Sequence, residues 1–232
     1  PFIIGAYRTL KIPAALTKKI LIKGTPLMLN EVLWAGGMAM INQCFSIRGL
    51  SVVAALNITS TIANLFNVIF IAMGSCVSIL VGQHLGANEF QEAKDTAAKV
   101  ITFSVFVTVI TSTVLYLVSG FFPQLYNTSQ GIRLLAGRMI CINAVVMPLQ
   151  AFLHSAYFTI RSGGRTWITF MFDSAYTWCV AIPFAYCIVH FTSLEILPVY
   201  AMYCSLDIIK AIVGFILLKK GIWVRNIVEN PC

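Results

Sequence analysis

The uncharged stretch SVVAALNITSTIANLFNVIFIAMGSCVSILV, residues 51–81, decides the fold class of this 232-residue chain. No Lys, Arg, Asp or Glu occurs between Arg48 and Glu89, and a membrane-spanning helix needs about 20 mostly apolar residues. The whole chain has the same character, since 59% of its residues are hydrophobic and 10% are charged, against about 25% charged in soluble domains. The stretch therefore predicts a helix that crosses a bilayer.

Five further apolar runs accompany this one. Lipid offers the backbone no hydrogen-bond partner, and the strands of a membrane barrel would alternate polar and apolar residues, which these runs do not. We therefore predict an all-α membrane protein in which residues 26–218 form one unit of six transmembrane helices. The predicted spans are 26–47, 51–81, 100–122, 134–160, 167–190 and 198–218.

The distribution of Lys and Arg predicts the orientation of these spans, because short cytoplasmic loops are enriched in positive charge. Only Arg48 and Arg133 lie on the poorer side. Residues 1–25 are then a cytoplasmic connector and residues 219–232 a cytoplasmic tail, in a plasma membrane. The net charge of +8 is a topology signal, so no nucleic-acid partner is expected. The richer side holds Arg8, Lys11, Lys18, Lys19, Lys23, Lys94, Lys99, Arg161, Arg165, Lys219, Lys220 and Arg225.

The sequence contains no motif for catalysis, metal binding or nucleotide binding. Its seven cysteines are scattered, and His84, His154 and His190 are far apart in the chain, so no metal site is expected. Neither a Walker loop nor a dinucleotide fingerprint occurs. We therefore expect a protein that is not an enzyme and holds no cofactor.

Four segments of the chain are informative together: GTPLMLNEVLWAGGMAMINQ (24–43), GLSVVAALNITSTIANL (49–65), VGQHLGANEFQEAK (81–94) and YFTIRSGGRTWITFMFDSAYTWCVAIPFAY (157–186). By their order and spacing, over roughly residues 11–228, the chain resembles the C-terminal half of a transporter of the multidrug and toxic compound extrusion (MATE) family, within the MOP superfamily.

The resemblance implies twelve helices in two six-helix lobes, related by a pseudo-two-fold axis along the membrane normal, of which this chain is the C-terminal lobe. It also implies the export of organic, drug-like cations from a bacterial cell by alternating access, coupled to H⁺ or Na⁺ antiport. The partners would be membrane lipid, the N-terminal lobe and a small organic cation. A flippase of lipid-linked oligosaccharide or lipid is the alternative, although few positive charges occupy the centre of the chain.

A Gly-Gln-x-x-Gly-Ala segment ends the second predicted span. Gly82 and Gly86 are four residues apart, so on a helix they share a face and could let another backbone approach closely. Gln83 between them could satisfy backbone groups at a cytoplasmic elbow as the lobe moves. An ordinary helix end is the other interpretation, followed by a helix over residues 87–99 on the membrane surface.

Glu31 is the candidate for coupling or for binding the substrate charge. It lies in the first predicted span without a sequence-local partner, and a charge at membrane depth is costly enough to indicate function. A carboxyl that moves between water and a low-dielectric cavity could bind and release a proton in competition with an organic cation. The alternative is a structural Glu near the helix start, where negative charge suits the helix dipole.

Two further groups of charges accompany it. Asp173 is predicted to form a salt bridge with Arg161 and Arg165, and Gly163 and Gly164 would supply the tight turn of a cytoplasmic hinge between the fourth and fifth spans. The same residues could instead be a turn with ordinary positive-inside charges. Separately, Asp207 and Lys210 are three residues apart, and we predict an intramembrane ion pair between them.

Polar and aromatic residues within the spans are candidates for lining a cavity. Amides give adaptable hydrogen bonds, and aromatic faces attract organic cations, although amides also join helices. In sodium-coupled relatives, acidic residues stand where Trp34 and Gln150 occur here, so a sodium site of that kind is doubtful in this chain. The cavity candidates are Asn30, Trp34, Asn42, Asn57, Asn64, Gln150 and Tyr157.

Overall fold

The computed structural model describes residues 14–225, and helices make up nearly all of this part of the chain. The prediction of an all-α protein is confirmed. The elements are α1 (Ala14–Ser46), α2 (Leu50–Gly86), α3 (Phe90–Val118), the short 3₁₀ helix η1 (Phe122–Leu125), α4 (Gln130–Ser162), α5 (Thr166–Phe170), the π-helical segments η2 (Met171–Ala175) and η3 (Thr177–Ala181), α6 (Ile182–Phe191) and α7 (Ile196–Lys219).

Within residues 14–225, five helices are long and apolar enough to cross a membrane: α2, α3, α4, the helix that runs from α5 to α6 (Thr166–Phe191), and α7. The remaining long helix, α1, is not among them. Its length would suffice, but Asn30, Glu31, Asn42 and Gln43 interrupt its apolar surface. The multi-pass character is therefore established, while the sixth span stays a prediction.

Two predicted boundaries differ from the structure. The helix α1 begins before Pro26 and continues through it, because the helix-forming residues 14–22 precede the proline and only one backbone hydrogen bond is lost there. Residues 90–99 belong to the start of α3, so they do not form the separate surface helix that we expected. Residues 1–13 and 226–232, at the ends of the predicted connector and tail, lie outside the described residues.

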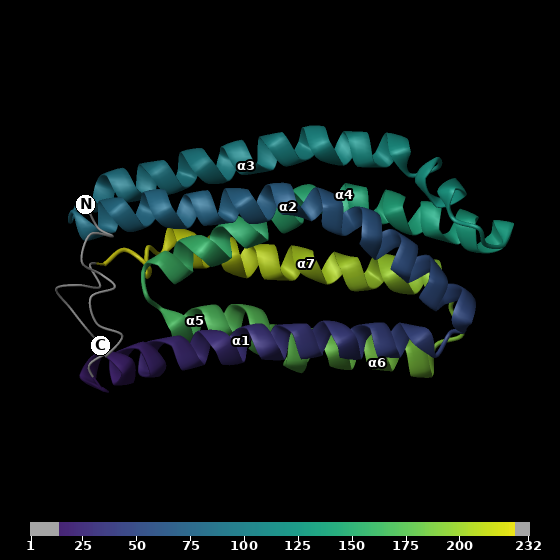
Figure 1. Ribbon diagram of the computed structural model, residues 1–232, viewed down its shortest axis with the longest axis horizontal. Coiled ribbons are helices and arrows are strands. Elements are labelled where there is room, and N and C mark those ends of the chain that lie inside the picture. The colour runs from purple at the N-terminus through teal and green to yellow at the C-terminus, as the bar shows by residue number, and fades with distance from the viewer. Residues whose placement is uncertain (1–13, 226–232) are drawn as a thin grey trace, which may run out of the picture.

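The helices form two groups (Figure 1). Helices α2, α3, α4 and α7 pack against one another, and we call them the body. Helix α1 packs mainly against the continuous helix Thr166–Phe191, and we call these two the outer pair. Helix α1 begins and α7 ends at the same end of the molecule, on the left in Figure 1.

Apolar side chains hold each group together and join the groups at one end. Leu115, Ile140 and Met147 belong to a buried cluster inside the body. A second cluster, around Phe45 of α1, includes residues of the body and of the outer pair, and the Phe45 ring contacts Tyr200 and Tyr203 edge to face. The outer pair is therefore attached to the body by apolar packing at the end of α1 that is remote from its start.

The outer pair contains a close helix crossing. A Cβ added at Gly37 of α1 would lie 2.6 Å from Cγ2 of Thr177 in η3, so glycine is needed where the two helices meet. Nearby, the Trp178 indole nitrogen donates to the Leu33 carbonyl at 2.9 Å. At the far end, Arg48 Nη2 donates to the carbonyl oxygens of Val189, at 2.9 Å, and Thr192. These contacts tie α1 and the helix Thr166–Phe191 into one unit.

Candidate functional site

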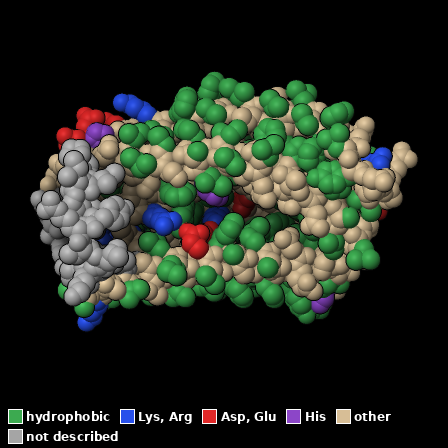
Figure 2. Space-filling view, in the orientation of Figure 1, with side chains coloured by type: hydrophobic (Ala, Val, Ile, Leu, Met, Phe, Trp, Pro, Cys, Tyr) green, Lys and Arg blue, Asp and Glu red, His purple; other side chains and the backbone are tan. Residues whose placement is uncertain are grey.

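A hollow lies between the body and the outer pair, and Figure 2 shows acidic, basic and histidine side chains gathered in it. Polar side chains of both groups meet across this gap, and we call this set of contacts the polar boundary. It consists of Asn30 and Glu31 from α1, Tyr157 and Arg161 from α4, Asp173 and Ser174 from η2, Tyr176 from the same helix, and Leu206 and Lys210 from α7.

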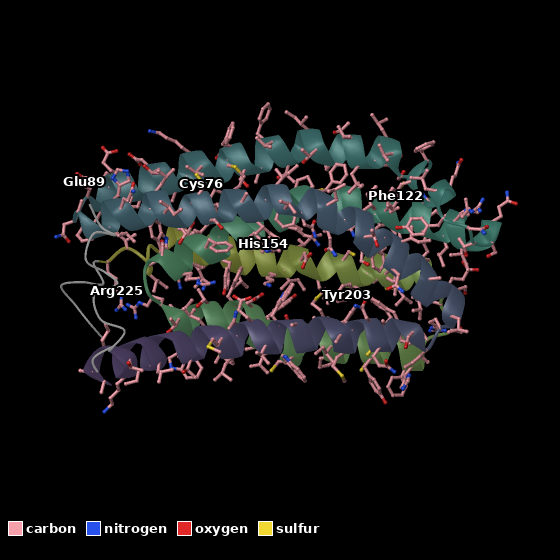
Figure 3. The ribbon with its side chains drawn as sticks, viewed as in Figure 1. Cys76, Glu89, Phe122, His154, Tyr203 and Arg225 are labelled. Carbon is pink, nitrogen blue, oxygen red and sulfur yellow. The ribbon has the colours of Figure 1, made fainter. Side chains whose placement is uncertain are left out.

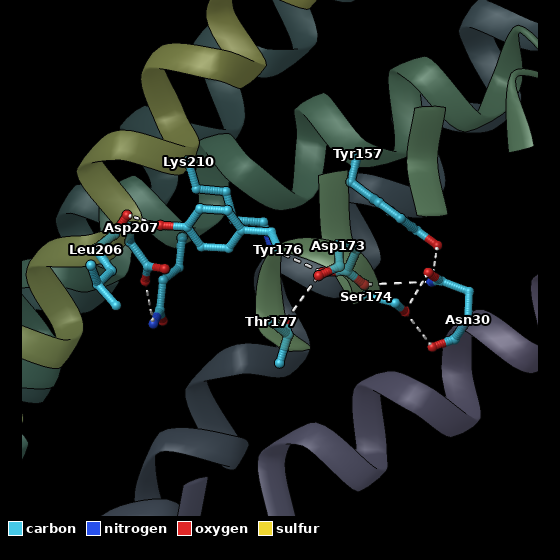
Figure 4. A network of polar contacts seen from close by, with 10 residues as sticks. Asn30, Tyr157, Asp173, Ser174, Tyr176, Thr177, Leu206, Asp207 and Lys210 are labelled. Carbon is cyan, nitrogen blue, oxygen red and sulfur yellow. Dashed lines mark hydrogen bonds and ion pairs between the residues drawn. The ribbon is translucent and has the colours of Figure 1, made fainter. Parts of the chain in front are cut away.

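Asn30 connects both helices of the outer pair to the body (Figure 4). Its Nδ2 donates to the Tyr157 hydroxyl at 3.1 Å and reaches Asp173 Oδ2 at 3.5 Å. The Ser174 hydroxyl donates to Asn30 Oδ1 at 2.7 Å. Because Asn30 is only 2% exposed, a substitution that removed its amide would leave several buried polar groups without partners.

The charged centre of the boundary is the ion pair between Lys210 and Asp173. Lys210 Nζ lies 2.9 Å from Asp173 Oδ1, and the two side chains are 16% and 17% exposed. The ammonium also lies over the rings of Phe172 and Tyr176, at 5.3 and 5.8 Å from their centroids. A single lysine of α7 thus fixes the π-helical segment η2 to the body by charge and by cation–π attraction.

The predicted ion pair between Asp207 and Lys210 is wrong, because Lys210 pairs with Asp173 in the structure. Their spacing places both on one face of α7, but the long Lys210 side chain extends to Asp173 of another helix. Asp207 Oδ2 instead accepts a hydrogen bond from Gln150 Nε2 of α4 at 3.3 Å. Within the described part of the chain, Asp207 forms no salt bridge within 4.0 Å.

The predicted bridge from Asp173 to Arg161 and Arg165 is also wrong. Arg161 Nη1 lies 3.4 Å from Glu31 Oε1, which joins α4 to α1, while Arg165 is exposed. The Glu31 side chain is 58% exposed and that of Arg161 30%, so solvent or lipid headgroups screen this pair. Glu31 therefore lies at the edge of the polar boundary. Its partner Arg161 is 130 residues away in the chain, so proximity in sequence could not identify it.

His154 is a residue of this region that sequence reasoning considered only as a metal ligand. Figure 3 shows it in the view between α2 and α7, and its ring packs edge to face against Phe70 of α2. It is close enough to Lys210 and Asp173 to interact with them electrostatically. His154 lies four residues after Gln150 and four before Phe158, so the three residues share one face of α4. This spacing could have identified His154 as a residue of the same region.

The candidate cavity residues separate into two sets. Asn30 and Tyr157 are hydrogen-bonded to each other at the polar boundary, and Gln150 is hydrogen-bonded to Asp207. The structure does not bring the other four together with them, and their side chains are exposed on the surface of the chain. These four are Trp34, Asn42, Asn57 and Asn64.

The close backbone approach expected at Gly82 and Gly86 is not observed. No atom outside their own helix turns lies within 4 Å of a Cβ added at either position, and Gln83 is exposed. The chain turns instead at Asn88, whose φ of 61° is left-handed. His84 Nδ1 and Glu89 Oε2, 2.7 Å apart, join the two sides of this turn.

The turn between α4 and α5 contains Gly163 and Gly164, and the chain that follows α7 packs onto it. Gly164 has a φ of 70°, which favours glycine. A Cβ added at Gly163 would lie 2.0 Å from the Trp223 carbonyl oxygen. Arg225 Nε donates to the Gly163 carbonyl at 3.2 Å, and Trp223 is 3% exposed. Part of the predicted tail is therefore packed against this turn.

Comparison with known proteins gives consistent results. The model of the MatE family matches residues 26–187. The probable multidrug resistance protein YoeA of Bacillus subtilis (strain 168) is 27% identical over 221 residues, covering 93% of this chain and 48% of that protein. The chain thus spans about half the length of this relative.

Solved structures show the same fold. A MOP superfamily transporter from Pyrococcus furiosus superimposes with a TM-score of 0.81 and 19% identity, over 94% of this chain and 51% of that one. A MATE protein in complex with MaL6 gives a TM-score of 0.79 at 19% identity, over 91% and 49% of the two chains. Both alignments again cover about half of the larger protein.

Proposed function

The chain belongs to the MatE family, and from this premise we propose that it is the C-terminal half of a transporter that exports drug-like organic cations. The multidrug resistance relative supports this function. The observation that carries it is the polar boundary, because its ion pair joins two helices that are each apolar enough to span a bilayer. Charged residues at membrane depth mark substrate and ion pathways.

The charges of the hollow suit a cationic substrate. Glu31, Asp173 and Asp207 supply three carboxylates, whereas Arg161 and Lys210 supply two cations. Tyrosine rings beside these groups add negative faces that attract organic cations. This balance of charge supports drug export over the transport of an anionic lipid-linked sugar.

The second lobe completes the proposed cavity. The exposed polar and aromatic side chains of the outer pair and of α2 are then available to face the N-terminal lobe or the substrate between the lobes. Alternating access would move the two lobes and, within this lobe, the outer pair against the body. These exposed side chains are Trp34, Asn42, Asn57 and Asn64.

The surroundings of the protein follow from the same proposal. Six helices, α1 included, would span a bacterial plasma membrane and contact lipid. The end that carries the start of α1 and the end of α7 would face the cytoplasm, because Lys and Arg are concentrated there. The packed turn at Gly163 and Gly164 would then be a cytoplasmic hinge, and the turn after Gln83 a second one.

The test is transport by the complete protein that contains this chain. Proteoliposomes would be loaded with an imposed pH or sodium gradient, and the movement of a fluorescent organic cation such as ethidium would be followed. We expect gradient-driven movement, and none after the gradient is dissipated with an ionophore. Absence of movement under both gradients, with folded protein in the vesicles, would refute cation export.

Glu31→Gln, with Glu92→Gln as the control at the exposed start of α3, tests the predicted role of Glu31. Loss of gradient-driven transport in the first variant and its retention in the second would assign coupling or substrate charge to Glu31. Unchanged transport in Glu31→Gln would make its ion pair with Arg161 structural.

A further inference from the structure

We propose that Asp207 is the proton-binding site of this lobe, and that Lys210 exchanges between Asp173 and Asp207 as the proton binds and leaves. The proposal rests on the proposed function and names the residue that couples proton movement to it. Its basis is that Lys210 has two carboxylates near it, those of Asp173 and Asp207. In the structure Lys210 pairs with Asp173, and Asp207 is hydrogen-bonded to Gln150.

The state in the structure is the one in which Asp207 carries the proton. Lys210 then neutralises Asp173 at 2.9 Å, and the neutral Asp207 needs only a hydrogen bond, which Gln150 provides at 3.3 Å. A side-chain amide has both a donor and an acceptor, so Gln150 can donate to an oxygen of Asp207 in either protonation state and, after rotation, accept from the hydroxyl of the carboxylic acid. The Gln150 position therefore tolerates both protonation states of Asp207.

Loss of the proton creates a competition for Lys210. Asp207 and Lys210 are three residues apart on one face of α7, where side chains of opposite charge attract. The new negative charge draws the Lys210 ammonium from Asp173, and this breaks the ion pair between α7 and η2. The carboxylate of Asp173 is then unpaired at the polar boundary and can attract an organic cation.

The charge balance of this exchange fits antiport. With Asp207 protonated, the three residues Asp173, Asp207 and Lys210 carry no net charge. After one proton leaves they carry a charge of −1, which one organic monocation neutralises. The proton and the substrate therefore compete for one negative charge, although they bind at two different carboxylates.

The surroundings of Asp207 favour a proton over a metal cation. Hard cations are held by several oxygen ligands, whereas the atom next to Asp207 is the Gln150 amide nitrogen and a lysine lies one turn away. The Tyr176 hydroxyl is occupied by the Leu206 carbonyl, to which it donates at 2.8 Å. The titratable and charged groups that interact electrostatically with Asp207 are Tyr200, Tyr203, Cys204 and Lys210 on α7 and Tyr176 on the helix Thr166–Phe191. Lys210 in turn interacts with Asp173 and His154.

The first experiment measures proton release. Tetraphenylphosphonium would be added to the purified full-length transporter in weakly buffered detergent containing a pH-sensitive dye. Wild-type protein should release protons when it binds tetraphenylphosphonium. By reciprocal linkage between the proton and the cation, the apparent Kd for tetraphenylphosphonium should fall by about tenfold for each unit by which the pH rises over the range in which Asp207 titrates. Asp207→Asn keeps the shape and the hydrogen bond but not the charge, so it should release fewer protons and show a flattened pH dependence.

A matched control is available on the surface. Asp95 accepts a hydrogen bond from Gln91 Nε2 at 3.3 Å, the same pair of side chains as Asp207 and Gln150 but exposed at the start of α3. Asp95→Asn should leave proton release, the pH dependence and gradient-driven uptake at wild-type values. A retained gel-filtration profile would show that each variant is folded.

The second experiment detects the protonated carboxyl directly. Every titrating carboxyl group contributes to difference infrared spectra between high and low pH; one carboxylic acid band should be shared by the wild type and Asp95→Asn and missing from Asp207→Asn. Lys210→Met should keep this band but lose the substrate-induced change, because no cation is left to exchange.

The outcomes separate this inference from the proposed function. If the wild type moves organic cations but Asp207→Asn keeps full pH-driven uptake, proton release and the infrared band, the assignment of Asp207 is wrong and export stands. If the wild type moves and binds no organic cation, the proposed function fails. A carboxylic acid band in wild type that Asp207→Asn abolishes would still support proton binding at this residue.

Discussion

The close packing of Trp223 on Gly163 predicts a large effect of one methyl group. An alanine Cβ at residue 163 would lie 2.0 Å from the Trp223 carbonyl oxygen, and ordinary van der Waals contact begins at 3.4 Å. The two backbones would therefore have to separate by about 1.4 Å. The backbone of Gly163 itself, with a φ of −77°, suits alanine, so Gly163→Ala tests the contact and not local strain. Over-packing of this kind costs about 1–3 kcal/mol.

The assay is thermal unfolding of the purified full-length transporter, followed by tryptophan fluorescence. We expect Gly163→Ala to unfold at a midpoint several degrees below the wild type. Gly82→Ala is the matched control, because nothing lies within 4 Å of its added Cβ and alanine in a helix is favoured over glycine by about 1 kcal/mol. Equal midpoints for Gly163→Ala and the wild type would refute the packing of the post-α7 segment on the α4–α5 turn.

Three more predictions concern the charges. Lys210→Met should destabilise the protein by about 3–5 kcal/mol, because it leaves the Asp173 carboxylate unpaired, and Asp173→Asn should cost less, because Lys210 can turn to Asp207. In a double-mutant cycle the double variant should lose less than the sum of the two. Glu31→Gln should change the unfolding midpoint little, since an exposed ion pair contributes about 0–1 kcal/mol. Arg48→Met should speed hydrogen exchange at the end of α6, measured by mass spectrometry, because two carbonyl groups lose their donor; unchanged exchange would contradict this role.

The fold was largely readable from the sequence because a bilayer limits a chain to few solutions. Apolar length located α7 at 198–218 in spite of Asp207 and Lys210, against Ile196–Lys219 in the structure. Hydropathy could not show that α1 continues ahead of Pro26, because proline marks a helix start in one context and lies inside a helix in another. The π-helical turns η2 and η3 leave no mark on hydropathy either, since they change the backbone spacing and not the composition.

The pairing of charges was predicted less well because nearest neighbours in sequence were assumed to be partners. Asp173 lies seven residues after the start of α5 at Thr166, and Lys210 lies nine residues before the end of α7 at Lys219. With a rise of about 1.5 Å per residue, both are roughly 10–14 Å from the same membrane side. The similar depth of Asp173 and Lys210 was therefore a signal from which their ion pair could have been predicted. It would not have been sufficient, because it cannot say which faces of two helices meet.

The interior of the body and the polar boundary differ in chemistry, and this difference predicts where the helices would separate during the proposed transport. Inside the body, separation of helices would expose the apolar cluster of Leu115, Ile140 and Met147, at about 25 cal/mol for each Å² of apolar surface. At the polar boundary, water can replace each hydrogen bond at a net cost of about 0.5–1.5 kcal/mol. The outer pair should therefore separate from the body along the boundary, with the apolar cluster around Phe45 as the pivot. Loss of the proton from Asp207, which draws Lys210 away from Asp173, removes the ion pair on that path, so the proposed coupling site acts where opening is already least costly.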